Sequence, residues 1–241
     1  MIGPARARRR RQVTTSVLVA AFAGAIAVTP ALGSHRFLTR ANAHAAALAI
    51  NLRQGDLPKL AAQSNPITAG QRRFSAQLTA CLGGVPDSEA YAVAQSPSFT
   101  GSGAPALTVS SASEILPTAA LVAKDLAAVD RSKGIPCLQR QLGRQLKASL
   151  AKGDTLAIRG APLPAVVSGS DGTFALRFSV VIGIKGGNSS RPLRVYYDTI
   201  GFAYGQAEVG LDVLSASAKP SAALERRLGA SLLARARAAI G

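Results

Sequence analysis

The first hydrophobic feature of the chain is an uncharged apolar stretch, Val13 to Gly33, which directly follows five arginines between Arg6 and Arg11. At about 1.5 Å per residue, a helix over this stretch is just long enough to cross roughly 30 Å of hydrocarbon. The arginines predict that the N-terminus stays on the inner side of the membrane. The pattern therefore predicts an export segment, residues 1–33, followed by an extracytoplasmic domain, residues 34–241.

Two fates of the export segment fit the sequence. Ala31 and Gly33 place small residues where a signal peptidase recognises its site, and Pro30 would break a helix just before them. If the segment is retained instead, it spans the membrane as a transmembrane anchor. Both alternatives stay open at this stage, so we expect the domain to be either secreted or anchored to the cell membrane.

The first half of the exported part has mainly helical spacing. Residues 36–52 are rich in alanine and predict a helix that becomes extended near its end. A second helix is predicted to begin after Ser64 or Thr68, either of which can cap it, and to end at about Leu82. Its inward side carries Phe74, Leu78 and Cys81.

A hairpin and a helix pair follow. Alternation over residues 91–99 and 106–115 predicts two strands. Pro117 is expected to open a helix in its first turn, and Gly134 to end the connection after it. The next helix is predicted over residues 136–152, with leucines in steps of four and Cys137 in its first turn.

The last third of the chain predicts a sheet. Residues 155–167, 173–184, 193–204 and 207–214 are apolar or alternating and are separated by short turns, so consecutive strands must be antiparallel. A final helix, opened by Lys219 to Ser221, is expected to run to about Ile240. This order predicts a single α+β domain, a twisted antiparallel sheet with flanking helices.

The chain has two cysteines, Cys81 and Cys137, separated by 56 positions. In an oxidising compartment we expect them to form one disulfide, which would stabilise the fold by about 4 kcal/mol in the chain-entropy model. Two free, buried thiols are the alternative. The only histidines, His35 and His44, lie far from either cysteine in sequence, so no metal site is expected. No cofactor is expected either.

The net charge of the chain is +16. Without the five N-terminal arginines, 23 basic and 12 acidic residues remain, so the exported part carries a net charge of about +11. Outside the membrane this favours anionic envelope lipids or acidic polymers as partners rather than nucleic acid. The alternative is a compositional excess of arginine. The weak candidates for such an anionic contact lie on two predicted helices: Arg140, Arg144, Lys147, Arg226 and Arg227.

Catalytic patterns are weak. His44 lies near the membrane segment, and Ser149 to Lys152 has the Ser-x-x-Lys spacing at the wrong end of a helix. Glu208 and Asp212, four apart on one strand face, would stand about 13 Å from each other, too far for glycoside hydrolysis. Residues 184–191 could wrap a phosphate but are more typical of a hairpin tip. We therefore expect no enzyme and no catalytic residue.

Several short pieces carry a resemblance. They are residues 50–58, Ala80 to Gly83, Gln95 to Phe99, Cys137 with Leu138, and Pro220 before the last helix. With these pieces, residues 48–240 resemble actinobacterial-type envelope domains, similar to the extracellular sensor domain of mycobacterial receptor Ser/Thr kinases and to PsbP-like lipoproteins. The resemblance implies an antiparallel sheet flanked by helices and, for the sensor domains, a ligand cleft.

The chain departs from these families in two ways. Only about a dozen residues precede the apolar stretch, where the receptors carry a kinase region, and no cysteine stands beside that stretch to accept a lipid. The sequence thus favours a non-catalytic binding or sensor-like domain at the cell envelope. Its partner would be a ligand, an envelope component or another protein. An exported hydrolase with a dispersed site and a structural envelope protein are the alternatives.

Overall fold

The computed structural model describes residues 37–241, apart from residues 104, 130, 165 and 186–191, and it does not describe the side chains of residues 131–133. The described residues all belong to one compact unit, residues 33–241. The predicted export segment lies outside the described residues. Within the described part of the chain, no helix is both long enough and apolar enough to span a membrane.

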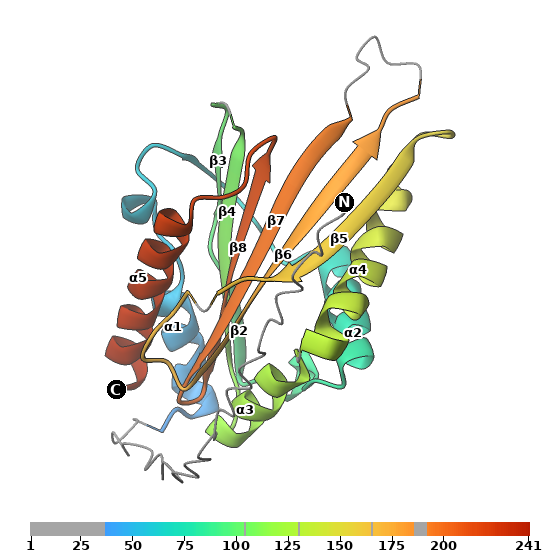
Figure 1. The fold of residues 1–241 in the computed structure, drawn as a ribbon. Helices are drawn as coiled ribbons and strands as arrows, with labels where there is room; N and C mark the ends of the chain where they lie inside the picture. Colours follow the sequence, from blue (N-terminus) through green and yellow to red (C-terminus); the bar gives the residue numbers. More distant parts are fainter. Residues whose placement is uncertain (1–36, 104, 130, 165, 186–191) are drawn as a thin grey trace, which may run out of the picture. The chain divides into compact units, whose positions relative to one another are not determined.

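One antiparallel sheet of eight strands forms the centre of this unit (Figure 1). Its spatial order is β1-β3-β4-β8-β7-β6-β5, and β2 pairs with β4 beside β3. The strands are β1 (Ala61–Gln63), β2 (Ala92–Gln95), β3 (Ser98–Gly101), β4 (Leu107–Ile115), β5 (Thr155–Pro162), β6 (Gly172–Gly183), β7 (Leu193–Tyr204) and β8 (Ala207–Ala216). The predicted α+β class is confirmed.

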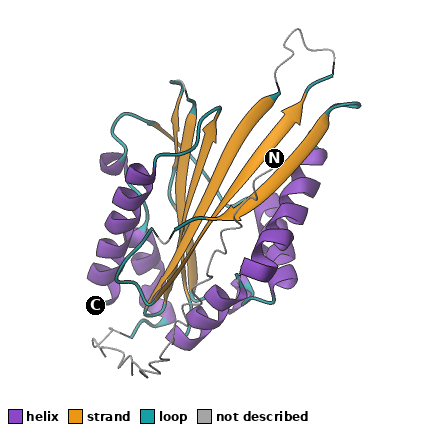
Figure 2. Cartoon of the chain, viewed as in Figure 1, coloured by secondary structure: helices purple, strands orange, loops and turns teal. Residues whose placement is uncertain are grey.

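Helices cover both faces of the sheet (Figure 2). On one face lie α1 (Arg40–Ile50) and α5 (Ala222–Ile240). On the other lie α2 (Ala69–Leu82), α3 (Ala119–Ala128) and α4 (Arg131–Lys147). Two short 3-10 turns, η1 (Gln54–Asp56) and η2 (Asp87–Glu89), join these elements to the strands.

The main core lies under α1 and α5. Alternate residues of β4 and β8 point to this face and are buried there, because successive strand residues face opposite sides. On α5, the residues in steps of four from Leu224 face this core: Leu224 is half-buried, and Leu228, Leu232, Ala236 and Ile240 are buried. Ser221 caps this helix by accepting a hydrogen bond from the Leu224 amide at 3.5 Å.

The opposite face of the sheet is divided. Under α4, Leu138 packs against Leu176 and Phe178 in a second apolar cluster. Toward β4 and β8 the same face carries Glu114, Glu208 and Asp212 instead. An apolar contact therefore anchors α4, whereas the neighbouring half of this face offers polar groups.

Three predicted boundaries were wrong. The structure starts α4 at Arg131, with Pro136 inside the helix and Cys137 beyond the first turn, and ends it at Lys147 rather than Lys152. Gly134 does not end the connection, because it is buried within this helix. A Cβ there would lie 3.0 Å from the Val129 carbonyl oxygen, so glycine permits the close turn between α3 and α4.

Three further predicted boundaries also differ. The first strand of the predicted hairpin is divided into β2 and β3 at Ser96 and Pro97, because proline has no amide N–H for the ladder. The cap of α3 is Thr118, whose Oγ1 accepts from the Leu121 amide at 3.2 Å, so Pro117 precedes the helix. The strand predicted over residues 155–167 ends at Pro162.

Candidate functional site

A cleft of about 570 Å³ lies between α2, η2 and the part of the sheet formed by β2, β4 and β8. We call it the α2 cleft. Its floor is formed by Val93, Gln95, Ala112, Glu114, Glu208 and Gly210, and its walls by Ile67, Gln71, Arg72, Ser75, Asp87 and Ser88.

Paired small residues give the cleft its depth. Ala112 of β4 lies directly opposite Gly210 of β8, and the next outward-facing pair along the two strands is Glu114 and Glu208. A Cβ added at Gly210 would meet nothing closer than the Ala112 carbonyl oxygen, at 4.0 Å. The floor is therefore open beside the two glutamates, and a larger side chain at position 210 would enter the cleft.

Three acceptor atoms in the floor have no hydrogen-bond partner among the described residues. They are Gln95 Oε1, Glu114 Oε1 and Glu208 Oε2, and each is buried from solvent as an atom. Buried polar groups in folded proteins are normally paired, so each exception calls for a physical reason. The three acceptors come from three different strands and line the same space.

Burial changes the protonation of these carboxyl groups. Burial, helped by the nearby Asp87 and Asp125 carboxylates, raises the pKa of Glu114 to about 8. Burial also raises the pKa of Glu208 well above its ordinary range, with Asp125 and Glu114 adding to the rise. At neutral pH Glu114 is therefore mainly protonated, and Glu208 keeps its proton to a higher pH than an ordinary glutamate does. A proton on Glu208 lets it hydrogen-bond to the Asp125 carboxyl group.

Asp125 of α3 is fixed beside the floor, on the same face of the sheet as the cleft (Figure 1). Its Oδ1 accepts a hydrogen bond from the Val85 amide at 2.5 Å. A Cβ on Gly84 would lie 2.3 Å from that same oxygen, so only glycine leaves room for this carboxyl group. The glycine at position 84 thus determines where the Asp125 carboxyl group lies against Glu208.

Hydrogen bonds fix the wall formed by α2 at its N-terminal cap and at the rim of the cleft. Thr68 caps the helix, since its Oγ1 accepts from the Gln71 amide at 3.1 Å while Gln71 Oε1 accepts from the Thr68 amide at 2.7 Å. At the rim, Ser75 Oγ donates to Asp87 Oδ1 at 2.8 Å, which joins α2 to η2. No residue of α2 is fully buried, so this helix is a cover rather than a core element.

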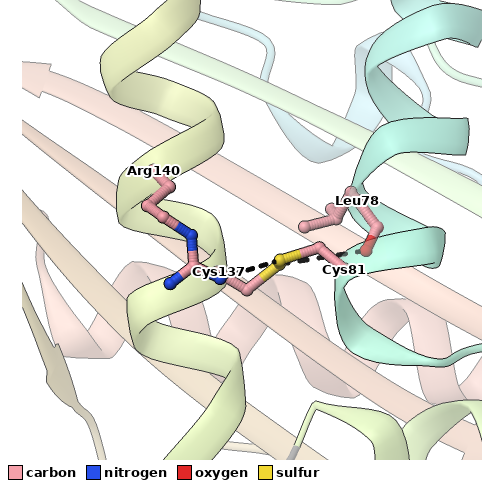
Figure 3. Close-up of a disulfide and its surroundings, with 4 residues drawn as sticks. All are labelled: Leu78, Cys81, Cys137 and Arg140. Carbon is pink, nitrogen blue, oxygen red and sulfur yellow. Dashed lines mark hydrogen bonds between the residues drawn. A yellow bond between two sulfur atoms is a disulfide. The ribbon is translucent and has the colours of Figure 1, made fainter.

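The predicted disulfide is confirmed. Cys81, one residue before the end of α2, is bonded to Cys137 of α4, and their Cα atoms are 6.0 Å apart (Figure 3). Cys137 is almost fully buried, and Arg140 Nη2 lies 3.2 Å from the Cys81 sulfur. Because α4 is anchored on the sheet through Leu138, the disulfide ties the cover helix α2 to a fixed element.

The structure does not bring the predicted basic residues together. Arg140, Arg144 and Lys147 are exposed on α4, whereas Arg226 and Arg227 are exposed on α5, which covers the other face of the sheet. Their contact with anionic lipids or polymers stays a prediction. Arg235, also on α5, is engaged within the protein: its Nη2 pairs with Asp56 Oδ1 at 2.6 Å.

Sequence reasoning missed the acidic pair in the cleft. The sequence pattern paired Glu208 only with Asp212. Asp212 lies on the same strand, and its Oδ1 accepts a hydrogen bond from the Tyr197 hydroxyl at 2.8 Å. The sequence signal for this pair was one glutamate at a solvent-side position in each of two strands whose polar and apolar residues alternate. Only the pairing of β4 with β8 makes them neighbours. His44, the candidate imidazole, is exposed on α1, on the opposite face from the cleft.

Comparison with known proteins gives one distant likeness. No family model matches the chain, and no curated protein matches it. Among solved structures, the extracellular domain of PknH from Mycobacterium tuberculosis is similar at 11% sequence identity and a TM-score of 0.42, over 85% of this chain and 99% of that chain. The predicted resemblance to receptor-kinase sensor domains is thus supported only as a distant likeness of fold, which carries no argument about function. The PsbP-like resemblance stays a prediction.

Proposed function

We propose that this chain is an extracytoplasmic, non-catalytic binding domain of the cell envelope, and that its ligand occupies the α2 cleft. The observation that supports this proposal is the set of three buried, unpartnered acceptors, Gln95 Oε1, Glu114 Oε1 and Glu208 Oε2, around one open space. Leaving a buried acceptor unpaired costs about 1–3 kcal/mol. A ligand that donates hydrogen bonds to these atoms would recover that free energy.

The protonation of the cleft favours binding over general-base catalysis. A general base must be ionised at the working pH, but burial holds the pKa of Glu114 at about 8 and that of Glu208 well above its ordinary range. Oδ1 of the third acid, Asp125, already accepts a hydrogen bond from the Val85 amide. These side chains are therefore suited to hold a ligand and poorly suited to remove a proton from one.

The proposed location rests on the disulfide and on the export segment. A disulfide between Cys81 and Cys137 fits an oxidising compartment outside the cytoplasm. The segment over residues 13–33 would direct the domain there, and it would hold the domain at the membrane if it is not cleaved.

The proposal can be tested by isolating the full-length chain from its native envelope and identifying retained small molecules by mass spectrometry. Gly210→Leu places a side chain in the floor of the cleft, and Gly55→Leu, where an added Cβ meets no atom within 4 Å, is the matched control. We expect one compound to be retained by the wild type and by Gly55→Leu and to be lost from Gly210→Leu. Equal retention by all three would mean that the compound does not lie in the cleft, and the proposal would be wrong.

A further inference from the structure

We propose that the group bound between Glu114 and Glu208 is a cation with several N–H donors, a primary ammonium or a guanidinium group. This inference rests on the proposed function and names the chemical class of the ligand. It follows from three features of the α2 cleft: the kind of atoms left unpartnered, the charge of the side chains around them, and the pairing of the two glutamates across neighbouring strands.

The unpartnered atoms of the floor are all acceptors. Gln95 Oε1, Glu114 Oε1 and Glu208 Oε2 can receive hydrogen bonds, so the ligand must supply donors. An ammonium group offers three N–H donors and a guanidinium group five, whereas an alcohol group offers one and a carboxylate none. A nitrogen cation therefore matches the floor better than a neutral polyol or an anion.

The charges around the cleft favour the same class. Asp87 lies at the rim, and Asp125 lies beside the lining, in hydrogen-bonding contact with Glu208, so four carboxyl groups gather here from β4, β8, η2 and α3. The basic side chain among the lining residues is Arg72, which is exposed on α2. The chain has 12 acidic residues and a net charge of +16, so four acids at one concave site oppose its overall charge.

Protons and a cation compete for the two glutamates. Carboxylates directly opposite each other on adjacent strands repel when both are ionised, and they are stabilised when a proton or a cation lies between them. Without a bound cation, protons held by the buried carboxyl groups relieve this repulsion. A cation that enters must displace them, so binding releases protons and strengthens as the pH rises toward 8.

Four probes with the same four-carbon chain separate the ligand classes: putrescine, agmatine, 1,4-butanediol and succinate. Each is titrated into the full-length chain by calorimetry at pH 6.5 and 7.5, in buffers of different ionisation enthalpy. We expect putrescine or agmatine to bind with release of about one proton, and to bind up to about tenfold tighter at the higher pH. Because agmatine carries one ammonium and one guanidinium group, tighter binding of agmatine identifies the guanidinium group and tighter binding of putrescine the ammonium group. The diol and the diacid should not bind.

Two variants locate the cation. Glu114→Gln combined with Glu208→Gln keeps the shape of the cleft and should weaken binding at pH 7.5 by about tenfold or more. Glu89→Gln, an exposed glutamate of η2 outside the lining, should leave it unchanged. Circular dichroism of each variant verifies folding, and if the double variant is unfolded the comparison is made with Glu114→Gln alone.

Four results would overturn this inference. They are equal binding of the diol and the diamine, preference for succinate, unchanged diamine affinity in the glutamine variant, and no binding of any probe. Binding of MgCl₂ that depends on both glutamates and excludes the diamines would also overturn it, in favour of a metal. None of these results bears on whether a compound is retained by the wild type and lost from Gly210→Leu, so the binding function itself is judged separately.

Discussion

Glu114 of β4 lies directly opposite Glu208 of β8, and the two side chains share the sheet face that α2 covers. Their neighbours along the strands, Ala112 and Gly210, are too small to fill the space beside them. One oxygen of each acid, Glu114 Oε1 and Glu208 Oε2, is thus buried without a hydrogen-bond donor among the described residues, which is a costly arrangement. That cost is the physical basis of the proposed binding function.

The first prediction concerns pH and Glu114. The pKa of Glu114 rises from an ordinary 4.5 to about 8 on folding, so between these values the folded state holds a proton that the unfolded state has released. Its stabilising contribution is complete below pH 4.5 and is lost as the pH rises through about 8. Glu114→Gln should therefore leave the free energy of unfolding unchanged near pH 5 and raise it by about 1–3 kcal/mol at pH 8.5.

Urea denaturation of the wild type and Glu114→Gln at pH 5 and 8.5 measures this effect, with the exposed Glu89→Gln as control. An equal difference between the wild type and Glu114→Gln at both pH values would show that the carboxyl group does not titrate as the burial requires.

The second prediction concerns the disulfide between Cys81 and Cys137. Replacing both cysteines by serine should lower the free energy of unfolding by about 4 kcal/mol, because a loop closed over 56 positions is released. Since α2 has no fully buried residue, it should be the first element to lose hydrogen-exchange protection. Exchange mass spectrometry should show faster exchange in residues 69–82 than in β7 and β8. Unchanged protection of α2 would contradict its role as a tethered cover.

The third prediction concerns Gly84. Gly84→Ala places a Cβ 2.3 Å from Asp125 Oδ1 and should displace that carboxyl group from the Val85 amide, at a cost of about 1–3 kcal/mol. Gly55→Ala, where the added Cβ meets nothing, is the matched control and should change stability by less than about 0.5 kcal/mol. Chemical denaturation compares the two. Equal stability of both variants would mean that Asp125 is not confined by this glycine.

The fourth prediction concerns Asp198 on the α5 face. This fully buried carboxylate accepts from Arg177 Nε at 2.7 Å and from Arg177 Nη2. Asp198→Ala leaves the guanidinium group without its main partner and should cost about 3–5 kcal/mol. Asp56→Ala breaks the more exposed pair with Arg235 and should cost less than half as much. Denaturation midpoints of both variants test the order, and a reversed order would contradict it.

Elements with a local hydrophobic period could be predicted from the sequence. The bounds of β7 were predicted to the residue, and the buried stripe of α5 follows its leucines in steps of four, because these signals depend only on neighbouring positions. The disulfide could also be predicted, since the chain contains only two cysteines. By contrast, the start of α4 was misplaced because Pro136 is typical of a first turn, whereas the helix begins at Arg131 and contains Pro136 in its interior.

The candidate site could not be predicted for a different reason. Glu114 and Glu208 become neighbours only through the pairing of β4 with β8, and neither strand's own pattern specifies its partner in the sheet. The small size of Ala112 and Gly210 has meaning only once these residues are known to lie opposite each other. Local patterns therefore predicted the elements, while the cleft arises from contacts between residues far apart in the sequence.

The central claim, that the α2 cleft binds a ligand, is tested most directly by a crystal structure of the full-length chain isolated from its native envelope. We expect electron density for a bound compound in the cleft, within hydrogen-bonding distance of Glu114, Glu208 and Gln95. A cleft that contains only solvent, or one closed by direct packing of α2 on the floor, would contradict the proposed function.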